Sequence, residues 1–123
     1  MFDKDLVQEI LKQIHASALT IESRFEPINK VDDFTESHQG MEKLDAICMQ
    51  LITIGENLKN LDKVTEGKLL SKHETIDWKA AMRMRDIISH HYFDIDAEVV
   101  FDVCQNKIGL LAKTVKQILE ELK

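Results

Sequence analysis

The residues best suited to chemistry lie close together, in the stretch 82–92 with the sequence MRMRDIISHHY. This stretch holds two guanidinium groups, two imidazoles, a carboxylate and a phenol. Arg85, His90 and Tyr92 are spaced as R-x4-H-x-Y, a set that could bind a phosphate, exchange a proton and offer a hydroxyl. We therefore take this stretch as the candidate functional site, and the other segments as the elements that must position it.

Cleavage of a phosphodiester by a neighbouring 2′-hydroxyl is the reaction that these side chains would suit. The reaction needs a group that titrates near neutral pH, and histidine, with an ordinary pKa of about 6.5, is such a group. It also needs a fixed donor for the charge that builds on the phosphorane, which a forked guanidinium such as that of Arg85 supplies. The reaction requires neither a metal nor a cofactor, and we predict none.

One set of residues could be drawn as a metal site: His73, Asp86, His90 and His91. Their spacing is unlike that of ordinary zinc sites, and the chain has no C-x-x-C or H-x-E motif. We therefore predict no metal site in this chain.

Spacing alone leaves a purely structural interpretation of the same residues open. On a continuous helix, Arg85 and His90 would point about 140° apart, so they converge only if the helix ends between them. We predict such an end near Ser89. In the structural interpretation, Arg85 pairs with an acidic side chain such as Asp86, His90 caps the helix, and Tyr92 is a half-buried anchor; such roles are common.

The apolar spacing predicts an all-α chain whose helices form an antiparallel up-and-down four-helix bundle. A short, irregular extra helix is expected between the second and third main helices, and residues 90–95 are expected to form a break. No strand pattern competes, and we treat residues 1–123 as a single domain. The predicted main helices cover residues 5–25, 37–61, 78–89 and 96–122.

Local signals indicate where these helices begin and end. Asp3 and Asp5 are suited to cap the first helix, and Pro27 is expected to end it near residues 24–26. Thr75 or Asp77 is expected to cap the third helix, and Trp78 to anchor it by burying a large ring. Phe34, in the loop after the first helix, is expected to fold back onto the bundle.

The predicted helix 37–61 carries more apolar side chains than a one-sided helix needs. One stripe is formed by Met41, Leu44, Cys48, Leu51, Gly55 and Leu58, and a second, offset stripe by Ile47, Ile54 and Leu61 with Ile52. Such a helix must be covered on two sides, either as the central member of a bundle or by a partner subunit. Gly55 indicates a close approach by another backbone, while Glu56 is either solvated or a partner for an arginine.

Composition favours a compact domain in a reducing compartment. The 123 residues are 44% hydrophobic and 31% charged, with four glycines and one proline, unlike disordered chains. Cys48 and Cys104 lie in apolar periodic segments, so we expect buried free thiols and a cytoplasmic location. We see neither a signal peptide nor an apolar run long enough to span a membrane, so we expect no membrane association.

The net charge of −6 argues against binding nucleic acid through broad electrostatics. The charge is unevenly distributed, however. Residues 1–62 hold 6 basic and 12 acidic side chains, residues 63–92 hold 6 and 4, and residues 93–123 hold 4 and 6. The candidate site therefore lies in the one basic part of the chain, where Lys79, Arg83 and Arg85 could together attract a phosphate.

Residues 78–101, WKAAMRMRDIISHHYFDIDAEVVF, together with ITIGENLKNL at 52–61, resemble the HepT-like family of small HEPN domains. The resemblance covers nearly the whole chain. Its most specific part is the R-x4-H-x-Y motif with a polar residue, here Asp86, directly after the arginine. The I-G-E segment and Trp78 ahead of the motif agree with it independently.

The resemblance implies a homodimer in which two copies of the motif meet in a cleft and act as a metal-independent endoribonuclease. Arg85 would stabilise phosphate charge, His90 would be the acid–base group, and Asp86 would orient Arg85 or a substrate hydroxyl. Lys79, Arg83 and His91 are candidates for further contacts with the RNA, for which tRNA and mRNA are candidate substrates.

The resemblance also implies a toxin–antitoxin pair, in which a small nucleotidyltransferase of the MNT type is the antitoxin and attaches AMP at Tyr92. The alternative is a non-catalytic helical binding module that scaffolds a nucleotidyltransferase or binds a nucleotide. A structural bundle without any site is a third interpretation.

Overall fold

The computed structural model describes residues 2–91 and 94–123, without the side chains of residues 89–91 and 94. Its elements are α1 (Lys4–Phe25), α2 (Asp32–Thr35), α3 (His38–Val64), a 3-10 turn η1 (Leu70–Lys72), α4 (Trp78–Met82), α5 (Met84–Ile88), β1 (Ser89–His91), β2 (Asp94–Ile95), α6 (Ala97–Asn106) and α7 (Ile108–Glu121). Apart from one very short strand pair, the ordered elements are helical, so the predicted all-α class is confirmed.

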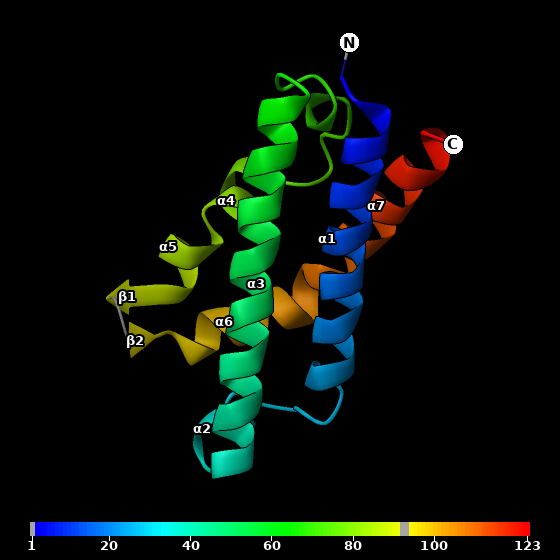
Figure 1. The fold of residues 1–123 in the computed structure, drawn as a ribbon. Helices are drawn as coiled ribbons and strands as arrows, with labels where there is room; N and C mark the ends of the chain where they lie inside the picture. The colour runs from blue at the N-terminus through cyan, green and yellow to red at the C-terminus, as the bar shows by residue number, and fades with distance from the viewer. Residues whose placement is uncertain (1, 92–93) are drawn as a thin grey trace.

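The long helices α1 and α3 run antiparallel beside each other and form one layer of the molecule (Figure 1). Each begins where a side chain caps the free N–H groups of its first turn. Asp3 accepts a hydrogen bond from the Leu6 N–H at 3.2 Å, and Ser37 accepts one from the Gly40 N–H at 2.9 Å. The helix α1 ends at Phe25, two residues before the only proline, as predicted.

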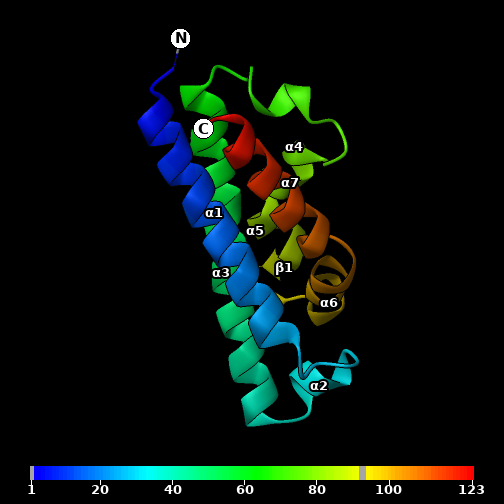
Figure 2. The ribbon, with the colours of Figure 1, turned by 90° about the vertical axis from the view of Figure 1, so that its right-hand side faces the viewer.

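The helices α4 to α7 lie on one face of this pair (Figure 2). Figure 2 shows α7 along α1, whereas α4, α5 and α6 lie against α3. At the far end, Phe25, Phe34 and Phe101 form an aromatic cluster with ring centroids 5.2 to 6.5 Å apart. Phe34 of α2 is fully buried there, which confirms that the segment after α1 folds back onto the helices.

Two of the predicted helices are each broken by a single residue. The expected helix 78–89 becomes α4 and α5, with Arg83 between them at φ −99° and ψ 26°, and the expected helix 96–122 becomes α6 and α7, interrupted at Lys107. The second break allows α6 to contact α3 and α5 while α7 packs along α1. Each one-residue break leaves the spacing of apolar residues almost unchanged, so periodicity did not reveal it.

The second apolar stripe of α3 is covered within one chain. Ile47, Ile54 and Leu61 are fully buried, and Ile52 packs partly buried against the same core. Since α1, α4, α5 and α6 all contact α3, the helix is the central member of its own subunit. The stripe therefore gives no support for a partner subunit. Among the described helices, none combines the length and apolar composition that a membrane span requires.

Candidate functional site

The candidate site begins with the cap and anchor of α4. The Asp77 carboxylate accepts a hydrogen bond from the Ala80 N–H at 3.0 Å, so of the two predicted caps, Thr75 and Asp77, the second is used. The next residue, Trp78, is 8% exposed, and its indole Nε1–H donates to the main-chain carbonyl of His73 at 2.7 Å. The predicted anchor role of Trp78 is therefore confirmed, and the bond fixes the start of α4 to the preceding connection.

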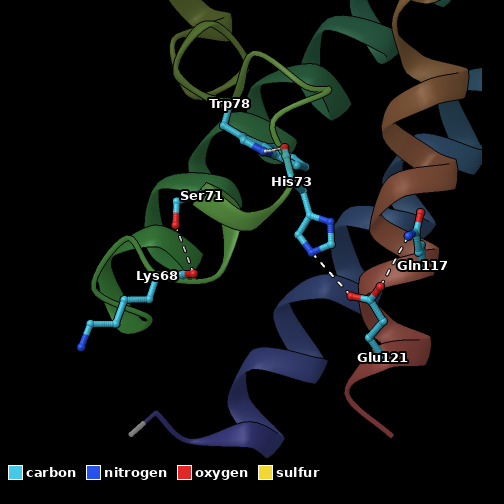
Figure 3. A network of polar contacts seen from close by, with 6 residues as sticks. All are labelled: Lys68, Ser71, His73, Trp78, Gln117 and Glu121. Carbon is cyan, nitrogen blue, oxygen red and sulfur yellow. Dashed lines mark hydrogen bonds and ion pairs between the residues drawn. The ribbon is translucent and has the colours of Figure 1, made fainter.

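A polar contact between His73 and Glu121 links the same connection to the end of α7. The Nε2 atom of His73 lies 3.6 Å from Oε1 of Glu121, and Glu121 also accepts a hydrogen bond from the Gln117 amide at 3.4 Å (Figure 3). His73 thus points toward α7 (Figure 3). Among the side chains that the structure describes, no group of three or more His, Cys, Asp or Glu residues could hold a metal ion.

The junction between α4 and α5 rests on the backbone of α3 at Gly55. A Cβ atom added to Gly55 would lie 2.9 Å from the Ala81 carbonyl oxygen, 3.3 Å from the Met84 Cβ and 3.4 Å from the Met82 carbonyl oxygen. The close backbone approach predicted from this glycine is therefore confirmed. At the junction the Asp86 N–H donates to the Arg83 carbonyl at 2.9 Å, instead of to the carbonyl of Met82 as in a continuous α-helix.

The short helix α5 has one buried and one exposed face. Met84 and Ile88 are buried, whereas Arg85 and Asp86 are exposed. The helix ends at Ile88, whose carbonyl accepts a hydrogen bond from the Asp96 N–H at 2.7 Å. That hydrogen bond links the start of α6 to the end of α5.

The chain leaves the helix where the sequence predicted, and enters an unpredicted strand pair. In the register of β1 and β2, Ser89 lies opposite Ile95 and His91 lies opposite Asp94. Arg85 thus lies on the helix and His90 on β1, so the 140° separation of a continuous helix does not apply to them. The side chains of His90 and His91, and the whole of Tyr92, lie outside the described residues.

The remaining charged candidates are spread around the α4–α5 junction. Lys79 on α4 and Arg83 at the break are exposed and four residues apart, the spacing of neighbours on one helix face. Glu56 pairs with Lys59 at 3.2 Å, and both side chains are about half exposed. Of its two predicted roles, Glu56 therefore has that of a solvated residue.

The two cysteines are free and buried, as predicted. Burial, with a smaller contribution from Asp45, raises the pKa of Cys48 to about 12, and burial with a smaller contribution from Cys48 raises the pKa of Cys104 to about 12. Because the thiolate is the reactive form, neither thiol is suited to nucleophilic chemistry at neutral pH.

One feature beside the site was not predicted. A hollow of about 240 Å³, lined mainly by apolar side chains, lies between α4–α5 and the α6–α7 break. Met84 and Ile87 of α5 line this hollow, together with Val103 of α6 and Leu111 of α7. Lys107, the residue at the α6–α7 break, also lines it, and the apolar spacing does not reveal that break.

Comparison with known proteins gives one family and several relatives. The family described as Ribonuclease HepT-like matches residues 5–118. A protein of Methanocaldococcus jannaschii, named as an inferred RNase, is 32% identical over 77 residues, which are 63% of this chain and 60% of the relative. A protein of Caldanaerobacter subterraneus subsp. tengcongensis, also named as an inferred RNase, is 35% identical over 78 residues, 63% of this chain and 66% of the relative.

The chain thus spans less than two thirds of the length of these two relatives. No solved structure shows significant similarity to it.

Proposed function

Because this chain belongs to the Ribonuclease HepT-like family, we propose that it is an endoribonuclease that cleaves RNA without a metal ion. The observation that carries the proposal is the end of α5. The helix presents Arg85 and Asp86 to solvent and stops at Ile88, so that His90 belongs to a different element. This arrangement permits a guanidinium and an imidazole to approach one phosphate, which a continuous helix would prevent.

In the proposed reaction, the 2′-hydroxyl of one nucleotide attacks the adjacent phosphorus, and the 5′-oxygen of the next nucleotide leaves. His90 exchanges protons with the attacking and leaving oxygens. Arg85 donates to the phosphate oxygens as charge develops on them. Asp86, the next residue on the exposed face of α5, orients Arg85 or a substrate hydroxyl. The products carry 2′,3′-cyclic phosphate and 5′-hydroxyl ends.

RNA binding in this proposal depends on local charge. The chain as a whole carries −6, but Lys79, Arg83 and Arg85 are all exposed and lie in its one basic part, where in this proposal they contact RNA phosphates together with His91. Few phosphate contacts make binding salt-sensitive and modest in strength. Because few phosphates are contacted, we expect cleavage at low RNA concentration to weaken moderately, not steeply, as salt is raised from 50 to about 200 mM.

The family suggests a cellular setting for the activity. We propose a homodimer whose two motifs share one cleft, acting in the cytoplasm as the toxin of a toxin–antitoxin pair. The partner would be a nucleotidyltransferase of the MNT type that attaches AMP to Tyr92. An AMP group beside Arg85 and His90 would add bulk and negative charge where the RNA phosphate binds, and so would block cleavage.

Cleavage of a defined RNA by purified protein in EDTA tests the activity. We expect cyclic phosphate ends, and loss of cleavage in His90→Ala and Arg85→Ala with helix content unchanged. His38→Ala, at an exposed histidine in the first turn of α3, is the matched control and should cleave normally. Cleavage that persists in His90→Ala would refute the assignment. An inactive protein that still binds a nucleotidyltransferase stoichiometrically would favour the non-catalytic binding module.

A further inference from the structure

We infer that Gly55 of α3 is a positioning residue for the RNA-cleaving site, acting through the α4–α5 junction to set the direction of Arg85. The inference rests on the proposed function of that site. It begins from the contact between the two backbones. The carbonyl oxygens of Ala81 and Met82 both face the position where a side chain at residue 55 would begin.

The contact leaves no room for adjustment by side chains alone. The nearest atom to a Cβ at residue 55 would be the Ala81 oxygen at 2.9 Å, a main-chain atom that cannot rotate away. An ordinary van der Waals contact begins at about 3.4 Å, so one of the two backbones must shift by about 0.5 Å. Gly55 is therefore required by the close approach of the helices.

The shift falls on α4 and α5. The helix α3 has 27 residues and is packed against α1 along its length, whereas α4 and α5 have five residues each. Met84, the first residue of α5, lies directly over Gly55, and Arg85 follows it. A displacement of the backbone at Ala81 and Met84 thus also moves the first turn of α5, and with it the guanidinium of Arg85. Gly55 acts in this way without contacting the substrate.

The expected effect on catalysis follows from the size of the shift. A misplacement of about 1 Å at a reacting group costs on the order of 100-fold in rate, so a shift of about 0.5 Å should cost about tenfold. The loss should appear in the rate of cleavage by the saturated enzyme, because a shift of about 0.5 Å disturbs the alignment of Arg85 with the reacting phosphate, whereas the exposed side chains of Lys79 and Arg83 can adjust to keep contact with the RNA. RNA affinity should change less than about threefold.

Gly55→Ala tests this inference against Gly109→Ala. Both changes add one methyl group to a helical glycine, but nothing lies within 4 Å of a Cβ at residue 109. In single-turnover cleavage, we expect Gly55→Ala to lose about tenfold in rate at unchanged affinity and Gly109→Ala to match the wild type. A wild-type rate for Gly55→Ala, or a loss confined to RNA affinity, would overturn the inference.

A spectroscopic measurement separates this inference from the proposed function. The chain has three arginines, so the side-chain Nε–H signal of Arg85 can be assigned by comparison with Arg85→Lys. Gly55→Ala should move the Arg85 signal and leave that of Arg24 unchanged. Wild-type protein that cleaves no RNA would refute the proposed function, whereas an unmoved Arg85 signal would refute the positioning role.

Ala81→Gly provides a milder second variant in case Gly55→Ala does not fold. This change keeps the carbonyl oxygen over Gly55 but loosens the backbone at the end of α4, at a cost of up to about 1 kcal/mol in stability. We expect a several-fold loss of cleavage rate and a broadened Arg85 signal. A wild-type rate with an unchanged Arg85 signal would again contradict the positioning role.

Discussion

Replacing Trp78 by phenylalanine tests whether the start of α4 is fixed by the bond from the indole to His73. The substitution keeps an aromatic ring in a site that is 8% exposed, but removes the Nε1–H that donates to the His73 carbonyl at 2.7 Å. The carbonyl belongs to the main chain, so it remains in place without this donor. Figure 3 shows the bond at the point where the connection between α3 and α4 turns toward α7.

The expected cost has two parts. Loss of the hydrogen bond to a partly buried carbonyl should destabilise the fold by about 1–2 kcal/mol. Phenylalanine also has about three fewer heavy atoms than tryptophan, and at about 0.8 kcal/mol for each buried carbon group this adds about 2 kcal/mol. We therefore expect the free energy of unfolding to fall by about 3–4 kcal/mol.

Urea denaturation followed by circular dichroism is the suitable assay, because Trp78 is the only tryptophan and its fluorescence is lost in the variant. His73→Gln is the matched control. It removes the polar contact with Glu121 but keeps the His73 carbonyl. That contact spans 3.6 Å and Glu121 is 54% exposed, so its loss should cost less than about 0.5 kcal/mol. A smaller effect for Trp78→Phe than for His73→Gln would refute the reasoning.

Two further predictions concern packing and the thiols. Gly40→Ala should lower the free energy of unfolding by more than about 3 kcal/mol in the same urea assay, since its Cβ would clash with the main-chain carbonyl oxygen of Asp33; a loss below about 1 kcal/mol would contradict the close contact. Native Cys48 and Cys104 should react with a disulfide reagent at pH 8 on the order of 1000-fold more slowly than in urea, because raising their pKa from 9.0 to about 12 lowers the thiolate fraction by about that factor. Because the folded state keeps these thiols protonated up to a higher pH than the unfolded state does, the free energy of unfolding should be unaffected by them below pH 9 and should fall as the pH rises from 9 toward 12. Equal reactivity of native and unfolded thiols would contradict both statements.

Apolar spacing predicted the long helices well because their buried faces repeat over many turns. Local signals predicted the end of α1 from Pro27, and included the caps that are used, Asp3 and Asp77, among their candidates; each of these residues acts on its own neighbours in sequence. The breaks at Arg83 and Lys107 depend on contacts with residues far away in sequence. The apolar pattern continues across them, so periodicity could not locate them.

For the candidate site, the sequence predicted the helix end near Ser89 and a close approach at Gly55. It could not identify the segment that approaches Gly55, because a glycine indicates space for a neighbour without specifying which one. It also left open what covers the second stripe of α3. Only the positions of α4 to α6 in the structure show that other helices of the same chain cover this stripe. The strand pair β1–β2 is too short for an alternating pattern to be recognised.

The aromatic cluster of Phe25, Phe34 and Phe101 has a consequence for how the site can vary. It holds α6 against the ends of α1 and α2 on the C-terminal side of the motif, while Gly55 holds the α4–α5 junction on the N-terminal side. The segment between these two anchors can therefore change its exposed side chains with little effect on the rest of the fold. A family built on this plan can vary the exposed residues of this segment while keeping the same scaffold.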